Sequence, residues 1–259
     1  MRVLYKILKI TERISGAVFS AVLVMAAVYT LYCITDEANV YVEAAQVKSE
    51  VEALRPDKEE EAETSESLPD FSKLMAINGD IRGWITLDGT NIDYPVVQGE
   101  TNQIYLNTDV FGENSLSGSI FLDYRNEGGF SDFVSLLYGH YMSGGSMFGE
   151  LALYKDTNFF LCNRTGTLLT PTCSYDLEIF AVLLVSASDD CIFNPVFFGK
   201  GDAEFYLSYV KENAIMLDEA KFSEALETED LKILELSTCS YEFTGARTVV
   251  IAIMKEALK

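Results

Sequence analysis

Short apolar runs, separated by Gly, Asn and Asp, dominate the chain from residue 71 onward. Most runs are rich in Val, Ile, Leu and Phe and are too short for a stable helix, which is typical of buried or half-buried β-strands. The runs lie at 83–87, 92–97, 118–123, 133–139, 167–170, 177–186, 231–238 and 247–253. Eight short strands within about 180 residues predict an all-β architecture, either a barrel or a sandwich.

Helical patterns interrupt the strands in three places. Residues 70–79 predict a short helix with Asp70 as its N-cap and Gly79 just beyond its end. A second helix is expected at 146–154. The third lies between residues 202 and 225, where four apolar side chains share one helical face. These are Phe205, Tyr209, Val210 and Met216.

The N-terminal part of the chain has a different pattern. The 22 residues from Ile14 to Thr35 carry no charge. As a helix they span about 33 Å, enough to cross a bilayer core. Lys and Arg precede the run and acidic residues follow it, which places the N-terminus in the cytoplasm. A cleaved signal peptide and a buried globular helix are the alternatives, but the length and the lack of a small-residue cleavage site favour an uncleaved anchor.

Residues 36–70 hold 12 acidic and 3 basic side chains and predict a solvated linker or an exposed helix. Apolar residues spaced between Val40 and Leu54 would let a helix continue outward as far as Pro56. The predicted organisation is a cytoplasmic basic tail (1–13), a transmembrane helix (14–35), an acidic extracellular linker (36–70) and an external β domain (71–259). The whole chain has 19 basic and 40 acidic side chains, and a net charge of −21 makes it an unsuitable partner for nucleic acid.

Three residues are candidates for chemistry. His140 is the chain's only histidine and follows an apolar strand, where a rigid element positions a ring that a loop leaves accessible. Cys239 ends another strand and Arg247 opens the next, so a hairpin would bring both to one end of the sheet. A thiol nucleophile is activated by nearby cations, and a guanidinium stabilises a developing oxyanion. Taken singly, each residue also has an ordinary interpretation: His140 as a structural or surface residue, Cys239 as a small core residue and Arg247 as a surface charge.

The other cysteines form no recognisable pattern. Cys162, Cys173 and Cys191 are spaced too widely for a metal or redox motif, and we interpret them as buried thiols. Cys33 lies at the end of the predicted membrane helix. One His and scattered Cys offer no zinc-ligand spacing, and the acidic residues lack a calcium-loop pattern, so we expect neither a metal nor a cofactor.

Five segments together resemble a known family, the class B sortases. In order they are NGDIRGWITLDGTNIDYPVVQ, YLNTD, GSIFLDYRN, YGHYMSGGSMFGEL and LSTCSYEFTGARTVV, and they run through nearly all of residues 71–259. The resemblance implies an eight-stranded sortase-like β-barrel with short helices, carried behind a membrane helix on the outer face of a Gram-positive cell. It also implies a cysteine transpeptidase that cleaves a C-terminal sorting motif of the x-Pro-x-Thr-x type after Thr. The acyl group would then pass to a peptidoglycan amine.

The resemblance also assigns roles to residues. Cys239 matches the nucleophile, His140 the general acid/base and Arg247 the residue that stabilises substrate or oxyanion. Ser237 and Thr238 match positions near the substrate, and Asn102 matches a substrate contact. The insertion between residues 186 and 231 resembles the substrate-facing loop of class B enzymes and is the expected source of motif selectivity.

Two departures from the family pattern are visible. Tyr141 stands where an Asn is common, and Thr101 stands where an Asp is common. Neither position belongs to the predicted Cys, His and Arg set. Three other functions share the same features: a pilin-polymerising sortase, an extracellular cysteine protease that releases its acyl group to water, and a non-catalytic surface-binding module.

Overall fold

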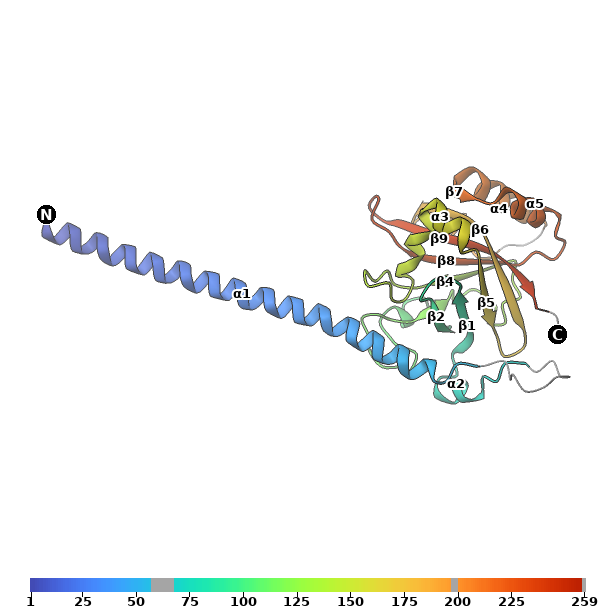
Figure 1. Cartoon of the computed structure of the whole chain (residues 1–259), viewed down its shortest axis with the longest axis horizontal. Coiled ribbons are helices and arrows are strands. Elements are labelled where there is room, and N and C mark those ends of the chain that lie inside the picture. Colours follow the sequence, from blue (N-terminus) through green and yellow to red (C-terminus); the bar gives the residue numbers. More distant parts are fainter. Residues whose placement is uncertain (57–67, 197–199, 258–259) are drawn as a thin grey trace. The chain divides into compact units, whose positions relative to one another are not determined.

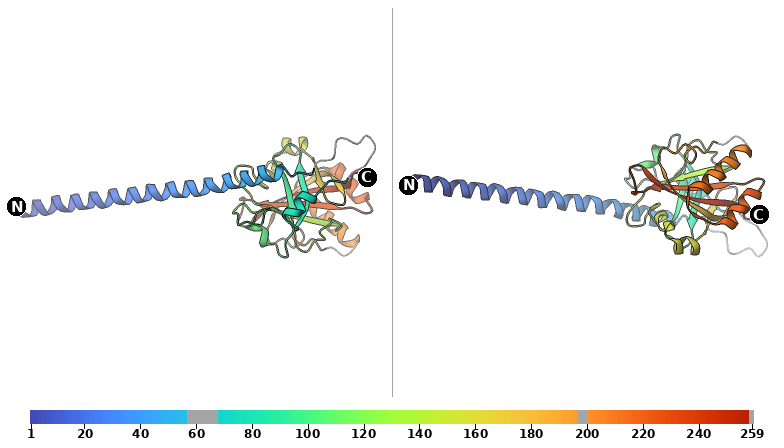
Figure 2. Two further views of the ribbon diagram at one scale, coloured as in Figure 1. Left: turned by 90° about the horizontal axis from the view of Figure 1, so that it is seen from below. Right: turned by 90° about the horizontal axis from the view of Figure 1, so that it is seen from above.

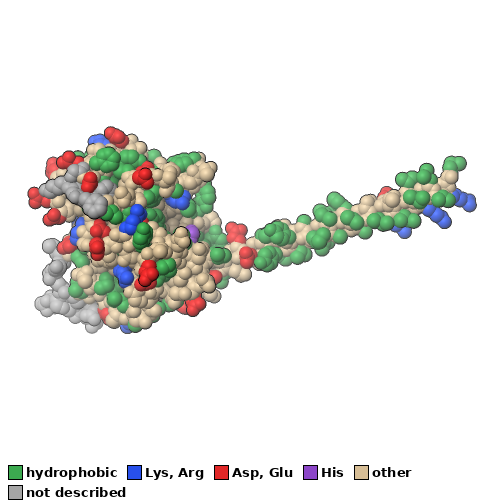
Figure 3. Space-filling view, turned by 180° about the vertical axis from the view of Figure 1, so that it is seen from behind, with side chains coloured by type: hydrophobic (Ala, Val, Ile, Leu, Met, Phe, Trp, Pro, Cys, Tyr) green, Lys and Arg blue, Asp and Glu red, His purple; other side chains and the backbone are tan. Residues whose placement is uncertain are grey.

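A computed structural model of the chain describes residues 1–56, 68–196 and 200–257 (Figure 1). The chain divides into two compact units, Met1–Glu43 and Ala44–Lys259. The first unit is wholly helical and belongs to α1 (Arg2–Glu52), a helix long and apolar enough to cross a membrane. Figure 3 shows apolar side chains along most of this unit, with Lys and Arg gathered toward its N-terminal end.

The second unit is built around a closed barrel of eight strands (Figures 1 and 2). The strands are β1 (Ile81–Leu87), β2 (Asp93–Val97), β3 (Ile120–Leu122), β4 (Val134–Tyr138), β5 (Thr165–Leu169), β6 (Ser174–Ser186), β8 (Ile233–Cys239) and β9 (Ala246–Glu256). Their order is β5-β1-β2-β3-β4-β8-β9-β6, and pairing of β6 with β5 closes the ring. This confirms the predicted eight-stranded barrel, because each predicted strand overlaps one of these.

Two strand pairs depart from antiparallel order and determine where the groove lies. The pairs β2–β3 and β4–β8 are parallel, whereas the other neighbours in the barrel are antiparallel. The ends of β4 and β8 therefore reach the same rim of the barrel. A ninth strand, β7 (Ala214–Leu217), adds to β6 outside the ring.

The helices are short and lie between the strands. They are α2 (Ser72–Ile77), η1 (Ile104–Leu106), η2 (Gly149–Lys155), α3 (Thr157–Cys162), α4 (Lys200–Asn213) and α5 (Glu219–Glu227). The single helix predicted between residues 202 and 225 is wrong, because β7 interrupts it and pairs Met216 with Val182. The helix predicted at 146–154 is mainly the 3₁₀ helix η2. The N-cap of α2 is Phe71, and Asp70 instead accepts a hydrogen bond from the backbone N–H of Ser72.

Helices α4 and α5 cover the outer face of β6, β8 and β9. Their buried side chains pack on one another and on outward-facing strand residues, which include Ile233 of β8 and Val249 and Ile251 of β9. Side chains alternate along a strand, so every second residue from Ile233 onward also faces outward. This places Glu235, Ser237 and Cys239 on the side of the barrel that α4 and α5 occupy.

The compact unit begins at Ala44, well before the predicted domain boundary at Phe71. The last turns of α1 pack on the barrel through Ala44 and Val51, which are 7% and 2% exposed. The ammonium of Lys48 lies 4.5 Å from the ring centroid of Tyr94, and Arg55 pairs with Asp93 at 2.9 Å. The apolar spacing noted before Pro56 is therefore a packing face of the barrel domain, whereas residues 57–67 of the predicted linker lie outside the described residues.

Candidate active site

A groove of about 390 Å³ opens at the rim where β4 and β8 end and β9 begins. The three residues predicted to carry chemistry, His140, Cys239 and Arg247, all line it. The groove also takes in residues from the segment after β2, from β3–β4 and from the segment after β6. Those used below are Asn102, Leu106, Arg125, Tyr138, Phe193 and Ser237.

The register of β8 and β9 brings two of these residues together. Cys239 is the direct partner of Arg247 in the antiparallel ladder, with no irregularity between the two strands. Residues directly opposite in such a ladder point to the same face, with Cβ atoms about 4.5–5.5 Å apart. The backbone therefore holds the thiol and the guanidinium side by side, and both side chains are half-buried.

His140 reaches the groove through the parallel pairing of β4 with β8. Tyr138 pairs with Ser237, and the Gly139 N–H donates to the Ser237 carbonyl at 3.1 Å. The Thr238 hydroxyl donates back to the Gly139 carbonyl at 2.8 Å. These bonds continue the ladder to the residue before His140, so the imidazole leaves the sheet beside the end of β8.

The imidazole of His140 has a defined tautomer. Its Nε2 lies 2.7 Å from the Leu106 carbonyl, which can only accept, so Nε2 carries a proton. In the neutral ring Nδ1 is then the basic nitrogen. The segment around η1 therefore fixes the ring orientation and leaves Nδ1 as the acceptor nitrogen of the neutral ring.

The guanidinium of Arg247 keeps most of its hydrogen-bonding capacity. Its Nη1 donates to the Ala246 carbonyl at 3.0 Å, which orients the group at the start of β9. A guanidinium has five N–H donors, and one bond leaves several to face a ligand. A fixed, multidentate cation next to a thiol suits stabilisation of a negative oxygen that forms nearby.

The loop after Cys239 is fastened to the segment after His140. Lys155 Nζ pairs with Glu242 at 2.5 Å and donates to Ser240 Oγ at 3.3 Å. The hydrogen bond from Lys155 is the main reason that the pKa of Glu242 falls to about 2. The rings of Tyr141 and Tyr241 also meet edge to face, with centroids 5.2 Å apart. Both contacts join the loop after Cys239 to the segment that follows His140.

The other predicted site residues on β8 differ in their burial and hydrogen bonding. Ser237 shares the outward face with Cys239, is 1% exposed, and its Oγ has no hydrogen-bond partner among the described residues. Thr238 also lines the groove, and its hydroxyl donates to the Gly139 carbonyl. Further along β8, the buried Glu235 accepts a hydrogen bond from Tyr206 of α4 at 2.6 Å.

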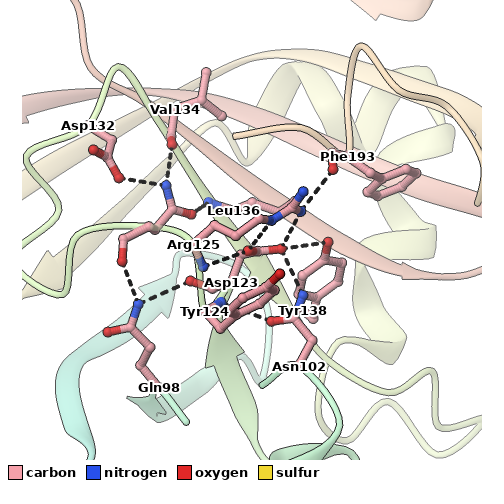
Figure 4. Close-up of polar contacts among 11 residues, drawn as sticks. Gln98, Asn102, Asp123, Tyr124, Arg125, Asp132, Val134, Leu136, Tyr138 and Phe193 are labelled. Carbon is pink, nitrogen blue, oxygen red and sulfur yellow. Dashed lines mark hydrogen bonds and ion pairs between the residues drawn. The ribbon is translucent and has the colours of Figure 1, made fainter. Parts of the chain in front are cut away.

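Asn102 belongs to a polar network that the sequence analysis missed (Figure 4). Its Nδ2 donates to the carboxylate of Asp123, which also binds Arg125 and Tyr138. Arg125 and Tyr138 line the groove, and Asp123 lies fully buried behind them. The available signal was the DYRN sequence at 123–126, where charged residues directly follow the buried strand β3.

The five cysteines are free thiols. Cys173 is buried and Cys191 is half-buried, and burial is the main cause that raises the pKa of Cys191 to about 11. Cys162 is exposed, so the prediction that it is a buried thiol is wrong. It ends α3 on the helix surface, where the sequence offered no apolar periodicity to place it.

Comparison with known proteins agrees with this geometry. No family model matches the chain. Sortase B of Listeria monocytogenes is 37% identical over 180 residues, 70% of this chain and 70% of the relative. Sortase B of Staphylococcus aureus is 34% identical over 186 residues, 71% of this chain and 74% of the relative.

Solved structures give the same result. A Streptococcus pyogenes class B sortase involved in pilus biogenesis is 40% identical with a TM-score of 0.64, over 72% of this chain and 98% of that one. A Staphylococcus aureus sortase B–substrate complex is 28% identical with a TM-score of 0.66, over 86% of this chain and 98% of that one. With its closed eight-stranded barrel and this degree of identity to curated relatives over more than two thirds of its length, the chain belongs to the class B sortases.

Proposed function

We propose that this protein is a membrane-anchored cysteine transpeptidase in which Cys239 is the nucleophile, His140 the general acid/base and Arg247 the oxyanion-stabilising residue. The observation that carries the proposal is the direct pairing of Cys239 with Arg247 in a groove that His140 also lines. A thiol, a proton-transfer group and a fixed cation on one groove are the parts that acyl transfer through a thioester requires.

The chemistry proceeds in two steps. The Cys239 thiolate attacks the carbonyl carbon of the Thr residue in the sorting motif, and the carbonyl oxygen becomes an oxyanion beside Arg247. The C–N bond then breaks as protonated His140 gives its proton to the leaving amine, which leaves a thioester on Cys239. An incoming amine attacks the thioester and gives up a proton to His140, and the C–S bond breaks to restore the thiolate.

The substrate we propose is a surface protein with a C-terminal motif of the x-Pro-x-Thr-x type, and the acceptor is a peptidoglycan amine. The solved relative from Staphylococcus aureus is a sortase B–substrate complex, which supports substrate binding by this chain as well. The hydroxyl of Ser237 has no hydrogen-bond partner among the described residues and also supports the proposal, because a buried polar atom that a ligand can satisfy favours binding. Asn102, which also lines the groove, offers an amide.

The N-terminal helix supports the location that we propose. Its 22 uncharged residues suffice for one span, and Lys and Arg at its N-terminal end favour a cytoplasmic N-terminus. The barrel domain would then lie outside the cell, where surface proteins and the cell wall meet. No cofactor takes part in the proposed reaction.

A second candidate acceptor has one observation in its favour. The chain is 40% identical to a Streptococcus pyogenes class B sortase involved in pilus biogenesis. A pilin-polymerising enzyme would use the same thioester but deliver it to a lysine amine of a pilin subunit. The two candidates differ only in the second step, so competition between acceptors separates them.

The test uses the compact unit from Ala44 to Lys259, as wild type and as Cys239→Ala. Quenched peptides of the x-Pro-x-Thr-x pattern are offered with and without hydroxylamine, a peptidoglycan amine or a pilin lysine peptide. Cleavage by wild type alone, with product diverted to an amine, supports transpeptidation, and the preferred amine identifies the acceptor. Cleavage indifferent to every amine would indicate a protease. A folded fragment that neither cleaves nor forms an acyl-enzyme would indicate a binding module.

A further inference from the structure

One buried carboxylate joins three side chains that line the groove. Asp123 directly follows β3 and is 0% exposed. Its Oδ2 accepts hydrogen bonds from Asn102 Nδ2 at 2.8 Å, Arg125 Nη2 at 2.8 Å and the Tyr138 hydroxyl at 3.2 Å. Its Oδ1 accepts from the backbone N–H and the Nε of Arg125, at 2.9 and 2.8 Å. Figure 4 shows these groups converging from three separate segments of the chain.

Asp123 stays ionised in this environment. Burial favours the neutral acid, but hydrogen bonds from Arg125 and Asn102 outweigh burial and lower the pKa of Asp123. The carboxylate is therefore an acceptor for all its partners at neutral pH. Because an ionised carboxylate cannot donate, each partner must present an N–H or O–H to it, which fixes the orientation of each partner.

The amide of Asn102 is oriented at both ends. Its Nδ2 donates to Asp123, and its Oδ1 accepts from the Tyr124 backbone N–H at 2.9 Å. An Asn side chain has two N–H donors and two lone pairs on its oxygen. Within the part of the chain that the structure describes, one donor and one lone pair therefore remain, and they match the C=O and N–H of an extended peptide backbone.

Arg125 extends the network to the far wall of the groove. The same Nη2 that binds Asp123 also donates to the Phe193 carbonyl at 2.9 Å. The Phe193 ring stacks on Tyr138, with centroids 6.3 Å apart and planes 19° from parallel. Asp123 thus holds the segment after β6 against β4 through two groove-lining side chains.

We propose that Asp123 is a positioning residue of the peptide groove, which orients Asn102 to bind the backbone of the sorting peptide and holds Phe193 in place through Arg125. The proposal rests on the proposed function. It predicts that Asp123 governs peptide affinity while the thiol chemistry at Cys239 is unaffected. Because Asn102 binds backbone groups, its contribution is independent of which side chains the peptide carries.

The experiment compares the full-length chain in detergent as wild type, Asp123→Asn, Asn102→Ala and the double variant. Peptide affinity is measured by fluorescence anisotropy in a Cys239→Ala background, and kcat and KM are measured with Cys239 intact. Alkylation of Cys239 by iodoacetamide reports thiol reactivity without any peptide. The control is Gln98→Met, because Gln98 supports the same turn from outside the groove by donating to the Asp123 and Asn126 carbonyls.

We expect Asp123→Asn and Asn102→Ala each to weaken peptide binding about tenfold, the value of one hydrogen bond. The double variant should lose less affinity than the two single losses combined, because Asp123 acts in part through Asn102. The alkylation rate and kcat should stay within about twofold of wild type, and Gln98→Met should leave affinity unchanged even where it lowers the melting temperature.

Two results would overturn the proposal. If Asn102→Ala binds the peptide as tightly as wild type does, Asn102 does not bind the peptide backbone. This result is decisive even if Asp123→Asn fails to fold. If Asp123→Asn lowers kcat and alkylation as much as affinity, its role is general stability. In both cases wild type still processes the peptide and the proposed function stands. A wild type that alkylates at Cys239 but binds no sorting peptide would overturn the function and the inference together.

Discussion

Cys239 and Arg247 are direct partners on adjacent antiparallel strands, so backbone hydrogen bonds, rather than flexible loops, set the distance between them. The arrangement needs no ion pair to a carboxylate to hold the guanidinium. Among the residues that the structure describes, it donates a hydrogen bond to the neighbouring Ala246 carbonyl and pairs with no carboxylate. A rigid cation of this kind can respond to charge that appears only in the transition state, which is where an enzyme gains rate.

Replacement of Arg247 by Lys should therefore affect turnover more than binding. Lys keeps the charge but loses the planar fork of donors, and loss of an oxyanion donor typically costs about 10²–10³ in kcat. Steady-state kinetics with a sorting peptide check this. Arg164→Lys, which alters a guanidinium paired with Asp218 outside the groove, is the matched control and should retain full turnover. Equal losses in both variants would contradict the assignment.

Replacement of His140 by Gln should separate orientation from proton transfer. Gln keeps an N–H that can reach the Leu106 carbonyl but cannot take up a proton, so turnover should fall about 10²–10⁴-fold. Alkylation by iodoacetamide, detected by mass spectrometry, checks that Cys239 is still present and accessible in this variant. Cys239→Ala should show no acyl-enzyme at all. Full turnover by His140→Gln would remove the imidazole from the mechanism.

Glu235 makes stability depend on pH in a defined direction. Burial is the main cause that raises its pKa to about 8, from a model-compound value of 4.5. Between these values the folded chain holds a proton that the unfolded chain releases, so this group contributes most at low pH and its contribution is lost as pH rises toward 8. Each pKa unit is worth about 1.4 kcal/mol, so the effect is on the order of several kcal/mol.

Glu235→Gln tests that direction because Gln keeps an acceptor for Tyr206 and cannot ionise. The free energy of unfolding, measured with denaturant between about pH 5 and 8, should fall with pH more steeply for wild type than for the variant. Parallel curves for the two proteins would show that Glu235 does not titrate in this range.

The end of α1 should contribute to the stability of the barrel. Val51 is 2% exposed, and Val51→Ala should cost about 1–3 kcal/mol by loss of buried apolar contacts. A fragment that begins at Leu68 should melt at a lower temperature than one that begins at Ala44. Leu226→Ala is the control, because Leu226 is 53% exposed and its loss should change stability little. Equal melting of the two fragments would show that the helix end is dispensable.

The sequence was sufficient for the features that depend on local pattern. Each of the eight barrel strands is an apolar run bounded by turn residues. Cys239, Arg247 and His140 lie at or just beyond strand ends, so their positions follow from the local sequence. The features that sequence analysis missed depend on pairing between segments that are far apart in the chain. β7 is a four-residue, half-exposed strand that forms only because β6 offers it an edge, so its residues look like part of a helix.

The same reason explains the groove network. Asp123, Arg125 and Tyr138 were present in recognised segments, but nothing local shows that Asn102 and Phe193, 91 residues apart, are joined through them. The start of the compact unit at Ala44 was not predicted, because the sequence pattern of an amphipathic helix is the same whether its apolar face packs on a barrel or belongs to a solvated spacer. Composition alone favoured the spacer.

The parallel pairing of β4 with β8 has a consequence for how the enzyme comes into being. His140 and Cys239 are brought together by strands separated by almost a hundred residues, and β8 and β9 are the last strands of the barrel in chain order. A chain emerging from the ribosome N-terminus first holds its histidine long before its thiol, and such long-range pairings form late. The proposed set of Cys239, His140 and Arg247 is therefore assembled only when the last strands pair and the barrel closes.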